Sequence, residues 1–138
     1  MKVVLDTNVL IAAFAARGLC EAVLGLCLEN HEIVLSQPLL LEVQGSLKLK
    51  LRLPQPVVEE ILDFLRAHSV LVEPKDVPAD ACRDPDDLMV LGTAEAAGAT
   101  YIVTGDGDSL SLEKFGDIPI LTPRKFWEKE AGSANAGR

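Results

Sequence analysis

Residues 2–8 of the chain read KVVLDTN, and this stretch decides the fold. A short apolar run that ends in polar residues is typical of a parallel strand covered on both faces. Similar runs occur at residues 32–35, 70–72 and 101–104, and segments with helical spacing lie between them. Strands that alternate with helices predict a three-layer α/β/α domain, with a mainly parallel sheet of four to five strands.

Apolar periodicity, N-caps and prolines predict the helices. These helices cover about residues 9–29, 36–50, 57–68, 85–98 and 110–115, and a last one begins after residue 123. Residues 118–121 (IPIL) are expected at an edge of the sheet, because proline cannot donate a hydrogen bond to a neighbouring strand. Residues 1–130 are expected to form a single domain, and residues 131–138 a flexible tail.

The composition indicates an intracellular globular protein. Of the 138 residues, 49% are hydrophobic, which is enough for a sizeable core. Cys20, Cys27 and Cys82 form no C-x-x-C pair and are expected as reduced core thiols in the cytoplasm. The apolar run at 9–16 is too short to span a bilayer, and Asp6 would interrupt a signal-peptide core, so no membrane partner is expected.

The net charge of −8 argues against a general electrostatic nucleic-acid binder, since such proteins are usually basic. The objection fails if the acids are concentrated at a metal site, because bound cations turn an acidic cleft into one that attracts phosphate. Lys48, Lys50 and Arg52, together with Lys2 and Arg124, are candidates for contacts with a phosphate backbone. For residues 48–52, an ordinary solvated helix end is an equally good interpretation.

Two aspartates follow predicted strands. Asp6 comes directly after the first strand, and Asp106 comes after the 101–104 strand with one glycine between them. In open parallel sheets, ligands bind beyond the carboxyl ends of the strands. If the two strands are neighbours, both carboxylates lie at the same edge of the sheet.

Asp87 shares a helix face with apolar residues, three positions before Val90 and four before Leu91. This spacing predicts that its carboxylate lies on the buried side, where the helix meets the sheet edge. The alternative is an ordinary helix start, in which Asp84 is the cap, Pro85 takes the first position and the acids favour the helix dipole.

Glu42 lies one turn into its helix, and Gly45 and Ser46 beside it leave room for a ligand. The alternative is a charge at the border of an amphipathic helix. Two carboxylates ~4 Å apart repel by about 4 kcal/mol at an effective dielectric constant of about 20, so a cluster requires a cation or raised pKa values. A site of oxygen ligands suits Mg²⁺ or Mn²⁺, and His31 and His68 are expected at the surface.

With these residues in place, the chain resembles the PIN-domain family of ribonucleases, most closely the bacterial and archaeal toxins of toxin–antitoxin pairs. The resemblance extends to about residue 128, and all five motifs occur in the family's order. The matching segments are VLDTNVL (4–10), SQPLLLEV (36–43), CRDPDD (82–87), YIVTGD (101–106) and IPILTP (118–123).

The resemblance implies a ribonuclease that hydrolyses phosphodiester bonds with one or two Mg²⁺ or Mn²⁺ ions. The family's catalytic and metal-binding acids carry over to Asp6, Glu42, Asp87 and Asp106. Two sets of residues are implied in supporting roles: Asn8 and Thr104 as polar groups that orient the acids, and Asp84 and Asp108 as extra ligands.

The resemblance also implies three partners: an RNA substrate, an antitoxin that inserts a basic side chain into the cleft, and a second copy of the chain. The sequence departs from the family pattern at two places. Leu88 stands where members often have a polar residue, and Gly107 adds freedom to the segment after Asp106.

Other functions remain open from the sequence. A phosphatase that uses Asp6 as its nucleophile would have a second aspartate two residues later, but position 8 is Asn. A nucleotide-binding module is disfavoured, because residues 105–107 lack the third glycine of a dinucleotide fingerprint. A DNA or flap nuclease with the same acids, and a regulatory RNA-binding protein without turnover, are the remaining alternatives.

Overall fold

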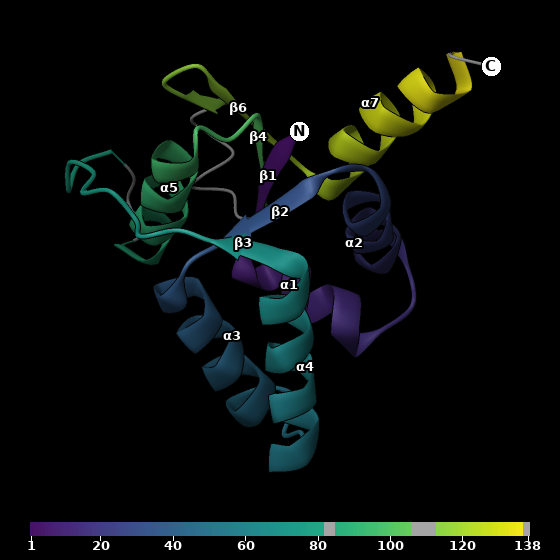
Figure 1. Ribbon diagram of the computed structural model, residues 1–138, viewed down its shortest axis with the longest axis vertical. Coiled ribbons are helices and arrows are strands. Elements are labelled where there is room, and N and C mark those ends of the chain that lie inside the picture. Colours follow the sequence, from purple (N-terminus) through teal and green to yellow (C-terminus); the bar gives the residue numbers. More distant parts are fainter. Residues whose placement is uncertain (82–84, 106–112, 137–138) are drawn as a thin grey trace.

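The computed structural model describes residues 1–81, 85–105 and 113–136, and it shows an α/β domain built on one sheet (Figure 1). The strand order in this six-stranded sheet is β3-β2-β1-β4-β6-β5. All neighbouring strands are parallel except β5 and β6, which are antiparallel. The strands are β1 (Lys2–Leu5), β2 (Glu32–Leu35), β3 (Ser69–Leu71), β4 (Tyr101–Val103), β5 (Lys114–Phe115) and β6 (Ile118–Leu121).

Helices cover both faces of the sheet, which confirms the predicted α/β/α class. In Figure 1, α5 lies on one side of the sheet, and α2 and α7 lie on the other. Helices α3 and α4 contact each other and project away from the sheet as a pair. The helices are α1 (Thr7–Ala15), α2 (Leu19–Asn30), α3 (Gln37–Leu49), α4 (Gln55–His68), α5 (Pro85–Ala97) and α7 (Pro123–Ala136).

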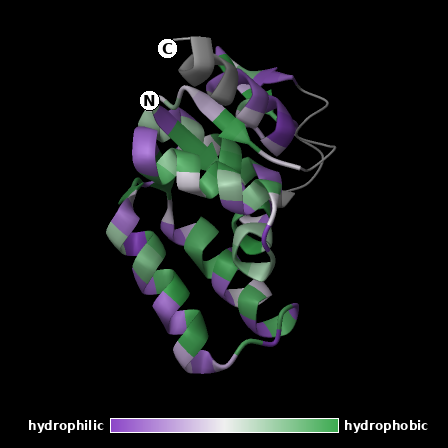
Figure 2. Cartoon of the chain, turned by 90° about the vertical axis from the view of Figure 1, so that its right-hand side faces the viewer, coloured by the Kyte–Doolittle hydropathy of each residue, from purple (hydrophilic) through white to green (hydrophobic). Residues whose placement is uncertain are grey.

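The core is centred on β1, which pairs with β2 on one side and with β4 on the other. Val3, Val4 and Leu5 are all 0% exposed, as expected for a parallel strand covered on both faces. Leu91 of α5 and Phe126 of α7 are also fully buried. Figure 2 shows the same pattern, since the hydrophobic colour is concentrated on the strands and the inner helix faces.

The single helix predicted over 9–29 is wrong. The chain forms two helices, α1 and α2, whose axes differ by 107°. Gly18, the residue before α2, has φ 158° and ψ −154°, a combination that is readily available only to glycine. The chain leaves α1 at Ala16, whose backbone is extended with φ −157° and ψ 158°, and Gly18 then sets the direction in which α2 begins. Apolar periodicity reveals neither of these backbone conformations.

The expectations for residues 110–121 were partly wrong. Lys114 and Phe115 belong to strand β5 rather than to a helix, because the turn at Gly116, with φ 59°, returns the chain into β6. Residues 110–112 lie outside the described ranges. Strand β6 is consequently not an edge strand, and the described residues form a sheet of six strands rather than four to five. Pro119 lies opposite Lys114, and the hydrogen bond toward this side is made by the next residue, Ile120, whose N–H donates to the Glu113 carbonyl at 2.9 Å. The missing N–H of the proline therefore costs the sheet little.

His31 is not at the surface, contrary to the prediction. Its side chain is 4% exposed, and Nε2 lies 3.2 Å from Oε2 of Glu130 in α7. Its ring also packs edge-on against Phe126, with 5.9 Å between the ring centroids. The burial comes from the docking of α7, a contact between distant parts of the chain. His68 is exposed, as predicted.

Helix α7 begins at Pro123 and ends at Ala136. The backbone N–H of Lys125 donates to the Thr122 hydroxyl at 3.0 Å, which caps the first turn.

The two described cysteines are free thiols, as expected. Cys27 is fully buried, and burial together with the nearby Glu130 carboxylate raises its pKa to about 12. Cys82 lies outside the described ranges. Within those ranges no single helix has the length and apolarity to cross a membrane, although the bent pair α1 and α2 would qualify by length and composition alone.

We predict that Gly92→Ala destabilises the fold by about 1–3 kcal/mol. A methyl group at Gly92 would lie 2.3 Å from the carbonyl oxygen of Lys75, whose N–H also donates to the Gly92 carbonyl. The matched control is Gly25→Ala within α2, where the added methyl meets nothing within 4 Å and should gain up to about 1 kcal/mol. Urea denaturation followed by circular dichroism measures both, and equal stability of the two variants would contradict the prediction.

Candidate active site at the carboxyl ends of the strands

The register of the sheet brings polar residues together at one edge. Val4 pairs with Val34 of β2 and with Ile102 of β4, so the three strands end in step. The residues two positions after Val4, Val34 and Ile102 therefore lie side by side and form a row across the carboxyl edge of the sheet. This row consists of Ser36, Asp6 and Thr104, and Thr122 continues it after β6.

Asp6 is a buried carboxylate held from the neighbouring strand. It is 5% exposed, and the Thr104 hydroxyl, itself 1% exposed, donates to Asp6 Oδ2 at 2.7 Å. The backbone N–H of Asp6 donates to the Val103 carbonyl at 3.0 Å. Asp6 stands at the N-cap of α1 without using its side chain as a cap. The Thr104 hydroxyl, at the end of β4, therefore helps to orient its side chain.

Asp87 is also buried, at 5% exposure, in the first turn of α5. This helix contacts β1, β2 and β4, and its residues Val90 and Leu91 belong to the core. The prediction that Asp87 lies on the buried face of its helix is confirmed. A helix N-terminus favours a negative charge at this position, which offsets part of the cost of burial.

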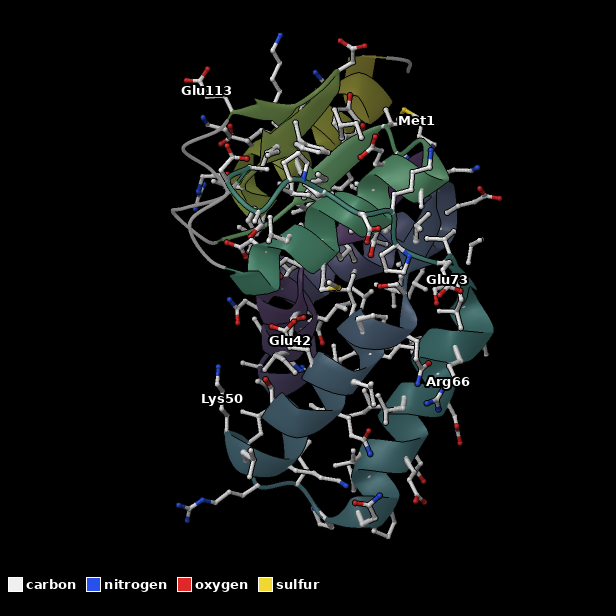
Figure 3. The ribbon with its side chains drawn as sticks, turned by 90° about the vertical axis from the view of Figure 1, so that its left-hand side faces the viewer. Met1, Glu42, Lys50, Arg66, Glu73 and Glu113 are labelled. Atoms are coloured by element: carbon white, nitrogen blue, oxygen red, sulfur yellow. The ribbon has the colours of Figure 1, made fainter. Side chains whose placement is uncertain are left out.

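Glu42 approaches this region from α3, which contacts α5. It is half-buried, and in Figure 3 it lies on the part of α3 near the start of α5. A Cβ added at Gly45, one turn along, would meet nothing within 4 Å. The surface beside Glu42 is therefore open, as the small residues at 45 and 46 predict.

The structure leaves part of the predicted site untested. Asp84, Asp106 and Asp108 lie outside the described residues, and Asn8 is exposed in the first turn of α1. Over residues 1–81, 85–105 and 113–136, no group of three or more acidic, histidine or cysteine side chains is arranged to hold a metal ion. The expected roles of Asp84, Asp106 and Asp108 therefore stay predictions.

The donor chemistry at this edge fits a hard divalent cation. The side chains that gather there offer carboxylate and hydroxyl oxygens, the ligand atoms that Mg²⁺ and Mn²⁺ prefer. The hydroxyl of Thr7, next to Asp6, is buried and makes no hydrogen bond with the described residues. A buried hydroxyl of this kind is expected where a bound water or ligand completes the hydrogen bonding.

Two buried residues near the acids were not predicted as part of the site. Thr93 of α5 lies 2.8 Å, oxygen to oxygen, from the hydroxyl of Ser36, and both residues are 0% exposed. Ser36 is the N-cap residue of α3, but its side chain makes no cap hydrogen bond. The sequence feature that could have indicated this contact is Thr93, a polar residue among the apolar positions of the helix predicted at residues 85–98.

A pocket of about 420 Å³ lies beside the row, at the carboxyl end of β6. Thr122 and Lys125 line it, together with Glu113. Lys125 therefore brings a positive charge close to the edge where the acids lie. An ammonium group in this place suits contact with a phosphate.

Comparisons with solved structures find the same fold in other proteins. VapBC2 from Rickettsia felis, in a structure bound to a DNA fragment from its promoter, has a TM-score of 0.63 and 16% identity, covering 88% of this chain and 98% of that one. FitAcB from Neisseria gonorrhoeae has a TM-score of 0.57 and 20% identity, covering 88% and 97%. At these identities the likeness concerns the fold. A search of curated protein sequences gives no match.

A family model adds evidence from the sequence itself. The model of the PIN domain matches residues 2–108, which is more than half of the chain. The matched segment runs from β1 to the region after β4 and contains all four predicted acids. The chain belongs to the PIN domain family.

Proposed function

We propose that the protein is a metal-dependent ribonuclease that hydrolyses phosphodiester bonds with one or two Mg²⁺ or Mn²⁺ ions. The observation that carries this proposal is the buried Asp6 carboxylate, held at 2.7 Å by Thr104 at the carboxyl edge of the sheet. Membership of the PIN domain family, whose members are generally nucleases, supports it. A buried carboxylate is costly to keep unless it serves a bound cation or another charge.

The ligand set we propose is Asp6, Glu42, Asp87 and Asp106, with Asn8 and Thr104 orienting the acids. Asp84 and Asp108 are proposed as additional ligands. A bound divalent cation supplies an activated water and offsets negative charge on the phosphate. Asp6, which Thr104 fixes in one orientation, and Asp87, which the first turn of α5 carries, are the proposed central ligands among the described residues.

RNA is the proposed substrate, and exposed cations are the proposed contacts for its backbone. Lys48, Lys50 and Arg52 are all exposed at the end of α3. The other two candidates have partners in the protein: Lys2 Nζ donates to the Ala97 carbonyl at 3.3 Å, and Arg124 lies 3.9 Å from the Glu128 carboxylate. We therefore propose that Lys48, Lys50 and Arg52 contact the phosphate backbone of RNA, in preference to Lys2 and Arg124.

We further propose that the protein is a cytoplasmic toxin that an antitoxin neutralises, and that it forms a homodimer. The order of the five PIN-like motifs and the structural likeness to VapBC2 and FitAcB support this proposal. A basic side chain from an antitoxin would suit the acidic edge at Asp6 and Asp87, because opposite charges stabilise each other strongly when partly buried.

We predict that Asp6→Asn abolishes Mn²⁺-dependent cleavage of RNA while the protein stays folded. The amide keeps the shape of the side chain but lacks the charge that would hold a cation, so the loss should exceed the roughly 100-fold typical of groups outside the ligand set. The measurement is cleavage of labelled structured and unstructured RNA, with DNA and a phosphomonoester as competing substrates.

The matched control for that measurement is Asp63→Asn, the same change at a carboxylate that is 79% exposed on α4. It should cleave like the wild type. Wild-type activity in Asp6→Asn would exclude the proposed site, and cleavage of DNA or of a phosphomonoester in place of RNA would exclude the proposed substrate.

We predict that Thr104→Val lowers Mn²⁺-dependent activity by about 10- to 100-fold, because the Asp6 carboxylate loses the hydroxyl that orients it. Thr104→Ser keeps this donor and should remain within about threefold of the wild type. Kinetics at a series of Mn²⁺ concentrations measure the effect. Full activity in the valine variant would show that the hydroxyl has no part in the site.

The toxin proposal predicts that expression of the wild-type chain arrests bacterial growth, whereas expression of Asp6→Asn does not. Growth curves and RNA integrity after induction are the measurements, with Asp63→Asn again as the control. Normal growth in wild-type cells that demonstrably contain active enzyme would contradict the toxin role and leave the nuclease activity standing.

A further inference from the structure

A buried pair of hydroxyl groups joins the two helices that carry Glu42 and Asp87. The Ser36 and Thr93 oxygens lie 2.8 Å apart, and both residues are 0% exposed. Ser36 stands between β2 and α3, and Thr93 lies in α5. The hydrogen bond therefore connects segments that are 57 residues apart in the chain.

Ser36 does not use its hydroxyl in the way that its position suggests. A serine that precedes a helix normally accepts a hydrogen bond from a backbone N–H in the first turn, which stabilises the helix. Ser36 is the N-cap residue of α3, with φ −140° and ψ 163°, but its side chain makes no such bond. Its hydroxyl is bonded to Thr93 instead, so the side chain serves a contact between elements rather than the start of α3.

The pair is anchored to the backbone of α5. The Thr93 oxygen also lies 2.7 Å from the carbonyl oxygen of Met89, one turn earlier. A threonine hydroxyl has one proton, so when Met89 accepts it the Ser36 O–H donates to Thr93. The resulting chain of hydrogen bonds, from Ser36 through Thr93 to Met89, fixes the orientation of both hydroxyls.

The location of the pair relates it to the acids. Ser36 occupies the same row as Asp6 at the edge of the sheet. Glu42 follows Ser36 by six residues on α3, and Asp87 precedes Thr93 by six residues on α5. Six helical residues rise about 9 Å. Glu42 and Asp87 therefore lie at similar distances, along α3 and α5 respectively, from the Ser36–Thr93 hydrogen bond. A shift of α3 against α5 at this hydrogen bond would change the separation of Glu42 and Asp87.

Packing alone does not require two hydroxyls here. Replacing both members of a buried hydrogen-bonded pair with apolar groups of similar shape is often nearly neutral for stability. A hydrogen bond differs from an apolar contact in that it fixes distance and direction, whereas apolar surfaces tolerate small shifts. The Ser36–Thr93 pair therefore suits a contact where the relative position of α3 and α5 matters more than the stability of the fold.

We propose that Ser36 and Thr93 are positioning residues that set the separation of Glu42 and Asp87 for binding a divalent cation. This proposal rests on the proposed function in one respect, that these acids bind Mg²⁺ or Mn²⁺. It does not depend on which nucleic acid is cleaved, nor on an antitoxin. The two residues act through the helices that they join and do not touch the substrate.

The test is Mn²⁺ binding, measured by electron paramagnetic resonance of the free ion during titration of the protein. The variant Ser36→Ala/Thr93→Val removes both hydroxyls and leaves no buried polar group without a partner. We expect it to stay folded, with a dissociation constant for Mn²⁺ raised about tenfold or more. In cleavage assays kcat should fall, while KM for RNA should change by less than about twofold.

Two further variants keep the test decisive. Ser36→Ala alone leaves Thr93 bonded to Met89, so it should fold even if the double variant does not, and it should also weaken Mn²⁺ binding. Thr93→Ser retains the hydroxyl and should bind Mn²⁺ as the wild type does. Ser69→Ala is the matched control, since its hydroxyl donates to Leu65 at the opposite edge of the sheet, and it should leave Mn²⁺ binding unchanged.

The outcomes separate this proposal from the proposed function. Wild-type affinity for Mn²⁺ in both Ser36→Ala and the double variant would overturn the positioning role, whatever the substrate. Equal losses in Thr93→Ser and the double variant would also overturn it, because they would show that the methyl group matters rather than the hydroxyl. If the wild type binds Mn²⁺ but cleaves no RNA, the ribonuclease fails, and weaker binding in the variants would still support the pair.

Discussion

The structure depends on the burial of β1 at the centre of a parallel sheet. This strand is bonded on both sides and covered on both faces, so Val3, Val4 and Leu5 are completely excluded from solvent. The strand ends in an aspartate whose carboxylate is also nearly excluded, at 5% exposure. A charge in this position is stable only with strong partners, and Thr104 from the neighbouring strand supplies one of them.

Helices α3 and α5 add further buried polar groups to this edge. Their burial lowers the stability of the fold, a cost that a purely structural domain would avoid. Asp87 is a second carboxylate at 5% exposure, and Ser36 and Thr93 bury two hydroxyls between α3 and α5. Each would be replaceable by apolar groups if only the core mattered. Apart from the His31–Glu130 contact under α7, the buried polar side chains of the described residues lie at this edge, and this concentration is the physical argument that the edge has a function.

The sequence predicts the features that depend on local pattern and strand order. The end of β1 places Asp6, and helical spacing places Asp87 on its buried face; both agree with the structure. Features created by contacts between distant segments were missed. The Ser36–Thr93 bond, the burial of His31 under α7 and the pairing of β5 with β6 all need partners that no local pattern identifies. The break between α1 and α2 was missed because it depends on the backbone conformations of Ala16 and Gly18, which hydrophobic spacing does not encode.

The most direct measurement of the central claim is a crystal structure of the protein soaked in Mn²⁺, with anomalous scattering used to locate the ion. If these acids share one metal site, the anomalous peak will place a Mn²⁺ ion on the Asp6 carboxylate and within reach of Asp87, at the carboxyl edge of β1 and β4. Well-ordered crystals at saturating Mn²⁺ with no peak at this edge, or with the ion bound only elsewhere, would contradict the account.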